Sequence, residues 1–324
     1  MNSMKNTVLM IAGFTLFAFV AAKIGWGDVI PQLRAVSLGL PLIIALSALR
    51  LFLQTSAWAT ALRAEGIPAY TGDLMGIRLA SQGAGYISVL GPAISEPMKI
   101  RLVGSDAGAT AVATLVDTGT YWFASSVFGI IACLGAALLV AQSRGSVILL
   151  AILAASFVTG LVLIARPKPL LTPVIRRLGL RAPRWLRKGE EIETMIRSFA
   201  SRHPRSLRRM FGLDFTCQVL LAAEVASVFL ILNIPVHAGT ILMLEAANRG
   251  MKMLTGWMPA RIGAEEGTTA GVFAALGLSS ASGLALALTR RMRDLLACAI
   301  GFTWLVFKTK VQSSRNEELV SCRP

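Results

Sequence analysis

Residues 81–101, SQGAGYISVLGPAISEPMKIR, decide how this chain folds, because they are apolar enough to enter a membrane but unsuited to one straight helix. They contain Gly83, Gly85, Gly91 and Pro92. A proline in a helix interior removes one backbone hydrogen bond, and its ring clashes with the preceding turn. Backbone groups freed in this way at membrane depth must be buried in protein or line a wet cavity. We therefore predict a re-entrant pair of half-helices over residues 72–104.

The composition of the whole chain indicates that a membrane is its solvent. Of the 324 residues, 55% are hydrophobic and 15% are charged, and the mean hydropathy is +0.65. A soluble domain of this length could not bury so much apolar surface in one core. We predict an all-α, polytopic membrane helical bundle with about six full spans and two re-entrant broken-helix segments. Apolar runs that approach the roughly 20 residues of a membrane span lie at residues 7–22, 38–62, 122–141, 147–165, 213–232 and 295–307 with its upstream turns.

The second half of the sequence repeats the pattern of the first. Residues 239–277 are again apolar and again interrupted, by Gly250, Gly256, Pro259 and Gly263, and a long helix follows. The two broken segments are predicted to enter from opposite faces, as in an inverted-topology repeat, which points to a transporter binding site. Residues 1–324 are thus expected to form a single transmembrane domain, with pseudo-repeats at about 38–166 and 211–309. Its straight helices are expected at about 6–24, 38–63, 107–141, 147–166, 211–232 and 280–309.

Most of the net charge of +15 lies in one loop. Thirteen Lys and Arg residues lie between residues 166 and 209, against three glutamates. Positive loops stay in the cytoplasm, so we predict that loop 167–210 and both termini are cytoplasmic in a bacterial inner membrane. Either this loop only fixes the topology, or it also contacts anionic lipid. Nucleic acid is not an expected partner.

Ionisable residues also occur inside the predicted spans, where each costs at least about 2.5 to 3.5 kcal/mol unless it meets a partner or water. The couples Glu245–Arg249 and Arg290–Asp294 are four residues apart and could neutralise each other on one helix face. Arginines beyond these couples indicate a site for an anionic group, since Arg binds phosphate in a bidentate manner and half-helix N-termini favour anions. The substrate-binding candidates are Glu96, Lys99, Arg101, Asp117, Glu245, Arg249, Arg261, Glu265, Glu266, Arg290, Arg291 and Asp294, with helix breaks at Gly91, Pro92, Pro259 and Gly263.

Signatures of conventional catalysis are not found in the sequence. His203 and His237 have no nucleophile or metal partner in sequence range, and no Walker loop, GxGxxG or HExxH occurs. The four cysteines show no metal spacing. We expect no catalytic residue, no metal and no cofactor, and therefore no enzyme. The alternatives are a membrane-embedded transferase, with Glu265, Glu266 or Asp117 as base, and a noncatalytic accessory protein.

Two motifs resemble a known family. Residues 259–267, PARIGAEEG, with the later ALTRR at 287–291, look like the C-terminal signature of the flippase-like transmembrane region of lysylphosphatidylglycerol synthases. Residues 91–101, GPAISEPMKIR, resemble the matching element of the first half. Ala260 and Arg261 replace the family's paired glycines, and Ser95–Glu96 replaces its Gly-Asp.

The resemblance implies a membrane lipid flippase or transporter. Its cargo would be an anionic, amino- or isoprenoid-type lipid that it moves or handles across the inner membrane. No aminoacyl-transferase domain follows the last span, so lysine transfer is not expected. Stand-alone relatives are associated with hopanoid and glycolipid biosynthesis. The expected partners are therefore membrane lipids, with lipid-biosynthesis enzymes and a second copy of the chain as further candidates.

Overall fold

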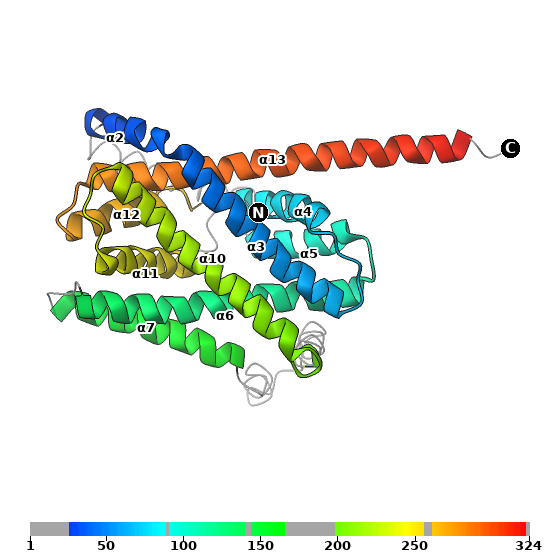
Figure 1. The fold of residues 1–324 in the computed structure, drawn as a ribbon, viewed down its shortest axis with the longest axis horizontal. Helices are drawn as coiled ribbons and strands as arrows, with labels where there is room; N and C mark the ends of the chain where they lie inside the picture. Colours follow the sequence, from blue (N-terminus) through cyan, green and yellow to red (C-terminus); the bar gives the residue numbers. More distant parts are fainter. Residues whose placement is uncertain (1–25, 89–90, 140–143, 166–197, 256–260, 322–324) are drawn as a thin grey trace, which may run out of the picture. The chain divides into compact units, whose positions relative to one another are not determined.

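The computed structural model describes residues 26–88, 91–139, 144–165, 198–255 and 261–321, and the regular elements in these ranges are all α-helices (Figure 1). The prediction of an all-α chain is confirmed for the described residues. The predicted span at 6–24, most of loop 167–210 and the predicted break at Pro259 lie outside them. The chain forms two compact units, and each unit combines segments that are distant in the sequence. Unit 1 comprises Met1–Ser37, Tyr70–Gly104 and Met251–Pro324, and unit 2 comprises Leu38–Ala69 and Ser105–Gly250.

Unit 1 is built around its last and longest helix. It contains α2 (Trp26–Leu38), α4 (Thr71–Ile87), α5 (Gly91–Val103), α12 (Ala264–Ala275) and α13 (Ser280–Ser321). Helix α4 packs against both α5 and α13, and α12 packs against α13. Near its start, α13 buries Ala281 and Leu284 against Val29 of α2. The two half-helices predicted from the first broken segment therefore share one unit with the region of the second break.

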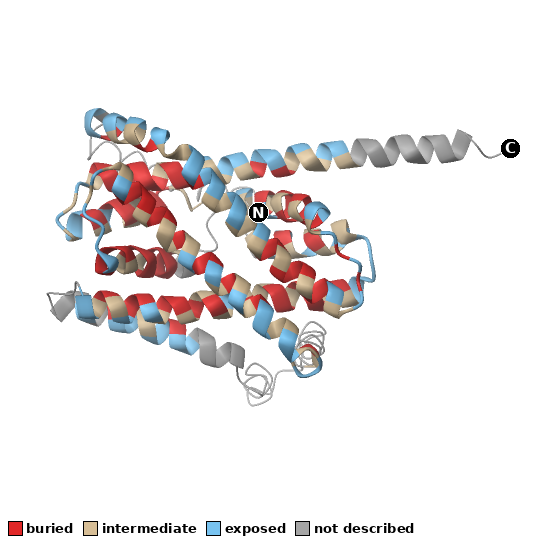
Figure 2. Ribbon diagram, in the orientation of Figure 1, coloured by how far each residue is buried: buried red, intermediate tan, exposed pale blue. Residues whose placement is uncertain are grey.

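Unit 2 contains the long apolar helices. These are α3 (Leu40–Ala64), α6 (Ala107–Leu139), α7 (Arg144–Ala165) and α10 (Pro204–Ile231), with most of α11 (Ala238–Leu254). Helix α10 packs on α3 and α6, and α6 packs on α3 and α7. Phe128 of α6 and Phe157 of α7 belong to one buried cluster with Ala246 of α11. This cluster is the apolar core of the unit, and Figure 2 shows buried residues along α6.

Three of the described helices, α3, α6 and α10, are long and apolar enough to cross a membrane. They agree with the spans predicted at 38–63, within 107–141 and at 211–232. Large apolar side chains on α3, such as Leu42 and Phe52, are about half exposed, as a lipid-facing surface requires. The count of about six spans stays a prediction.

The first broken segment consists of two helices separated by a break, and its re-entry into the membrane stays a prediction. Helix α4 ends at Ile87, Ser88 has an extended backbone, and α5 begins at Gly91. The break thus lies just before Gly91 and Pro92, which form the first turn of α5, where a proline lacks no needed donor. A Cβ added at Gly85 would lie 2.9 Å from the carbonyl oxygen of Gly91. The fold-back of α5 on α4 therefore depends on glycine.

Glycines also bring α4 and α13 into backbone contact. A Cβ at Gly76 would collide with the Trp304 ring, and one at Gly83 would lie 3.2 Å from Cys298 Cα. A Cβ at Gly301 would collide with the backbone of Leu79. Residue numbers rise along one helix as they fall along the other, so the two helices run antiparallel. The same register places the last turn of α4 opposite the turn of α13 around Asp294.

Two helices differ from the prediction. Helix α2 was not predicted, because Asp28, Pro31 and Arg34 interrupt its apolar pattern, yet it buries Val29 and Val36. Helix α13 was expected to end near residue 309 but continues to Ser321, which makes it about 63 Å long. No Gly or Pro occurs between residues 302 and 321, so nothing in the local sequence terminates the helix.

The contact between Gly85 and Gly91 predicts a test of the fold-back. Gly85→Val should lower the free energy of unfolding by about 1 to 3 kcal/mol, because the new side chain meets the Gly91 carbonyl. Thermal unfolding of the purified protein in detergent measures this. Gly72→Ala in the first turn of α4, where a Cβ meets nothing within 4 Å, is the matched control and should be neutral or slightly stabilising. Equal effects of the two changes would contradict the fold-back.

Candidate functional site

The start of α12 is held by its own carboxylate. Gly263 is the N-cap residue and has φ +80°, a conformation suited to glycine. The Gly263 backbone N–H donates to Glu266 Oε2 at 2.8 Å. Two residues earlier, Arg261 also has a positive φ, +48°, which is unusual for a residue with a side chain. The loop after the second predicted break is therefore fixed in a special conformation directly before two carboxylates.

Arg291 of α13 is the partner of this carboxylate. Its Nε lies 2.5 Å from Glu266 Oε1, and the Arg291 and Glu266 side chains are 15% and 1% exposed. Glu266 thus joins the start of α12 to the middle of α13. The adjacent Glu265 and Arg290 are also buried. Opposite charges buried this close together stabilise one another, and removal of one partner leaves the other buried without compensation.

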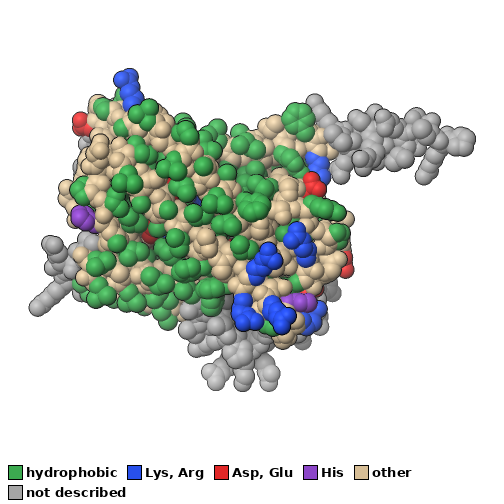
Figure 3. Space-filling model, in the orientation of Figure 1, with side chains coloured by type: hydrophobic (Ala, Val, Ile, Leu, Met, Phe, Trp, Pro, Cys, Tyr) green, Lys and Arg blue, Asp and Glu red, His purple; other side chains and the backbone are tan. Residues whose placement is uncertain are grey.

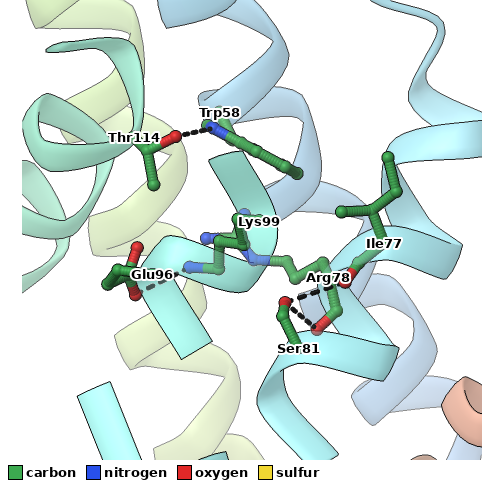
Figure 4. A network of polar contacts seen from close by, with 7 residues as sticks. All are labelled: Trp58, Ile77, Arg78, Ser81, Glu96, Lys99 and Thr114. Carbon is green, nitrogen blue, oxygen red and sulfur yellow. Dashed lines mark hydrogen bonds and ion pairs between the residues drawn. The ribbon is translucent and has the colours of Figure 1, made fainter. Parts of the chain in front are cut away.

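A second charged set lies where α4 and α5 pack together. Lys99 Nζ donates to Glu96 Oε1 at 2.9 Å, and both residues belong to α5. Arg78 of α4 is buried, and in Figure 4 its side chain points toward α5, where Lys99 lies. Arg101, two positions after Lys99, is exposed. The first broken segment therefore buries two cations, Arg78 and Lys99, and Lys99 pairs with the partly exposed Glu96.

Tyr86 was missed by the sequence analysis. It lies in the last turn of α4, opposite the turn of α13 around Asp294 in the antiparallel register set by the glycine contacts. Asp294 in turn accepts hydrogen bonds from Arg293, at 2.8 Å from its Nη2. The signal in the sequence was the spacing of Gly76 and Gly83, which sets one face of α4 against α13 and places Tyr86 on that face.

The remaining candidates belong to unit 2 and form a separate network. Arg249 Nη1 lies 2.5 Å from Glu245 Oε2, so the predicted couple exists. Its Nη2 donates to Gln218 Oε1 at 2.7 Å, and its guanidinium lies 4.6 Å from the centre of the Phe128 ring. Asp117 is fully buried in α6. One turn earlier on α6, Thr114 accepts a hydrogen bond from Trp58 Nε1 at 3.2 Å (Figure 4).

The predicted site residues therefore divide between the units. Nine of the twelve lie in unit 1, and Asp117, Glu245 and Arg249 lie in unit 2. The Arg249 guanidinium is bound to three side chains of its own unit, and this network joins α11 to α10 and α6. Unit 1 accordingly contains the larger set of candidates for an external ligand.

Cations outnumber carboxylates among the charged residues of unit 1 described above. Arg261 and Arg291 carry buried N–H groups without a hydrogen-bond partner among the described residues. These are Nε of Arg261, Nη2 of Arg291 and Nε of Arg291, which lies close to Glu266 Oε1 as an ion pair without hydrogen-bond geometry. Buried donors of this kind are rare in folded proteins, and they suit a phosphate oxygen. The described residues contain no group of three or more His, Cys, Asp or Glu that could hold a metal ion. The cationic members are Arg78, Lys99, Arg101, Arg261, Arg290, Arg291 and Arg293, and the anionic members are Glu96, Glu265, Glu266 and Asp294.

Comparison with known proteins gives one match. Residues 7–301 match the family model described as the lysylphosphatidylglycerol synthase TM region. Neither a curated protein nor a solved structure matches the chain. The matched region contains both broken segments and the charged residues of unit 1 described above.

The Glu266–Arg291 pair predicts a coupled loss of stability. Arg291→Gln alone should lower the free energy of unfolding by about 3 to 5 kcal/mol, because it leaves the Glu266 carboxylate buried without its cation. The double variant Glu266→Gln/Arg291→Gln should lose less than the sum of the two single variants, by about 0.5 to 3 kcal/mol. Thermal unfolding in detergent measures all three. Additive losses would show that the pair does not stabilise unit 1.

Proposed function

Because the chain belongs to the family of lysylphosphatidylglycerol synthase TM regions, we propose that it is a lipid flippase or transporter of a bacterial inner membrane. The family is related to membrane lipids, and the described helices fit a multi-pass membrane protein. The proposed cargo is a lipid with an anionic head group, of the phospholipid, aminoacyl-lipid or isoprenoid-phosphate type. The protein would transfer no group, so the lipid would leave chemically unchanged.

The buried, unbonded donors of Arg291 and Arg261 support this proposal most directly. An arginine donor buried away from water loses hydration that no protein group replaces. A phosphate oxygen would restore that hydrogen bond and would balance the cationic excess of unit 1. In this scheme, the head group is bound by the arginines while the acyl or isoprenoid tails stay in the lipid.

The two sequence halves are part of the same proposal. Half-helices that enter from opposite faces would bring their N-terminal ends toward one binding region near the bilayer midplane. The start of α5 at Gly91 and the start of α12 at Ala264 are the two ends in question. Their partial positive charge would favour an anionic group.

Reconstitution into liposomes tests the proposed transport. The full chain should accelerate the passage of a fluorescent phospholipid with an anionic head group between leaflets, scored by the loss of protection from a membrane-impermeant quencher. Arg290→Gln should slow this passage at least about tenfold, since binding of the head group needs the cations of unit 1. Arg34→Gln, which neutralises an exposed arginine of α2, is the control and should retain the full rate.

Two outcomes would count against transport. If no anionic, aminoacyl or isoprenoid-phosphate lipid crosses faster in the presence of the folded protein, the chain is not a flippase. If the chain instead co-purifies with a lipid-modifying enzyme and raises the activity of that enzyme, the accessory role would replace the transport role.

The inverted arrangement predicts the membrane sides of two positions. Of single cysteines introduced at Tyr70, before α4, and at Leu278, between α12 and α13, one should react with an impermeant thiol reagent in intact cells and the other only in inside-out membrane vesicles. Cys322→Ser removes the native thiol of the tail from the experiment. A cysteine at Arg205, near the basic loop, should react only from the cytoplasmic side. Labelling of both test positions from one side would contradict the inverted repeat.

A further inference from the structure

The exposed face of α10 in unit 2 is cationic in its first turns and uncharged along the rest of its length. Its first turns carry Arg205, Arg208 and Arg209, all exposed. Arg202, just before the helix, is 54% exposed and pairs with Glu65 at 3.3 Å. The other three arginines have no carboxylate within ion-pair distance in the described part of the chain. Figure 3 shows blue side chains gathered beside a histidine at one end of the surface, next to a largely green face.

The arginines continue into an uncharged stripe on the same face. Arg205 and Arg209 are followed at spacings of three or four residues by Gly212, Thr216 and Val219, which places them all on one side of the helix. These three residues are exposed, whereas Asp214, Cys217, Gln218 and Leu221 on the opposite side are buried. The stripe ends at Leu230, which is 68% exposed.

The length of this stripe fits one membrane. Arg209 and Leu230 are 21 positions apart, which is about 31 Å along an α-helix and close to the roughly 30 Å of a bilayer hydrocarbon core. The arginines therefore lie at the depth of the lipid phosphates when the stripe faces the lipid tails. Helix α10 begins here, so its free N–H groups add partial positive charge at the same depth.

The surface beside the arginines can also accommodate the acyl chain of a lipid. A Cβ at Gly212 would meet nothing within 4 Å, so the space beside the helix is open there. The Thr216 hydroxyl donates to the Gly212 carbonyl at 2.8 Å, so it needs no water and can lie against a hydrocarbon tail. Apolar and small side chains follow to the other end of the helix.

We infer that this face of α10 binds an anionic phospholipid of the surrounding leaflet, with its phosphate on Arg205 and Arg209 and an acyl chain along Gly212, Thr216 and Val219. The guanidinium groups hold the phosphodiester in a bidentate manner, which lysines in the same places could not do. This lipid is a bound neighbour of the protein and not its transported cargo. The surface belongs to unit 2, whereas nine of the twelve candidate transport residues belong to unit 1.

A fluorescence experiment on the full chain in vesicles tests the inference. The chain carries a fluorophore at Val219→Cys, with Cys322→Ser to remove the tail thiol. Vesicles of phosphatidylcholine contain rising fractions of phosphatidylglycerol or phosphatidylcholine with brominated acyl chains, which quench on contact. Brominated phosphatidylglycerol should reach half-maximal quenching at a several-fold lower fraction than brominated phosphatidylcholine. This preference should weaken in high salt, because the attraction is electrostatic.

Charge-neutral variants locate the effect. Arg205→Gln/Arg209→Gln should reduce the preference for phosphatidylglycerol by about fivefold for each arginine removed. Arg205→Lys/Arg209→Lys should reduce it less, because charge remains while bidentate binding is lost. Arg34→Gln, on an exposed arginine of unit 1, should leave it unchanged. If the glutamine pair does not fold, each single variant should still show its fivefold loss.

Two results would overturn the inference. The first is equal quenching by the two brominated lipids with the unsubstituted arginines, which would leave an acidic protein as the partner class for this face. The second is an undiminished preference in the folded glutamine variants, which would place the lipid elsewhere. Neither result depends on whether the chain transports lipid.

Discussion

Buried charge is the constraint on which the rest of this structure depends. Glu266 is almost fully buried and is balanced by Arg291 of a different helix, while its second oxygen caps the start of α12. Water cannot hydrate a carboxylate in this position. The two helices must therefore meet at this point so that the arginine compensates the buried charge. Gly263 adopts its positive φ where its backbone N–H donates to this carboxylate.

Glycines allow a second close helix contact within unit 1, between α4 and α13. At Gly76, Gly83 and Gly301, α4 and α13 approach so closely that a side chain at these positions would meet the partner helix. In lipid, burial of apolar side chains contributes little to the association of helices. Close backbone approach of this kind is therefore a main source of packing energy. It also sets the antiparallel register that places Tyr86 near the charged turn of α13.

In unit 2, the buried charge of Arg249 is compensated in a different way. There Arg249 is bound by Glu245, by Gln218 and by the face of Phe128. The charge of Arg249 is thus balanced by groups of its own unit. In unit 1, buried arginine donors remain without hydrogen bonds among the described residues. Nε of Arg249 in unit 2 is also without a hydrogen-bond partner among the described residues, so what distinguishes unit 1 is its larger set of charged candidates, nine of the twelve.

The sequence by itself determined the helical membrane class, the family and the positions of most helices. Apolar runs and their Gly/Pro interruptions are local properties, so they predicted α3, α6 and the break before Gly91. The four-residue spacing of Glu245 and Arg249 likewise predicted their ion pair, because that spacing puts both on one helix face. Helix α2 and the extension of α13 were not predicted, because hydropathy detects apolar membrane spans and does not detect polar helices.

Only the tertiary structure decided which charges meet. Glu266 and Arg291 are 25 positions apart on different helices, and no periodicity relates them. Tyr86 lies opposite the charged turn of α13 only because the glycine contacts fix α4 against α13. The division of the candidates into two units is of the same kind, because each unit combines distant stretches of chain. Local sequence sets the shape of each helix, whereas the pairing of buried charges depends on the packing of helices that are far apart in the sequence.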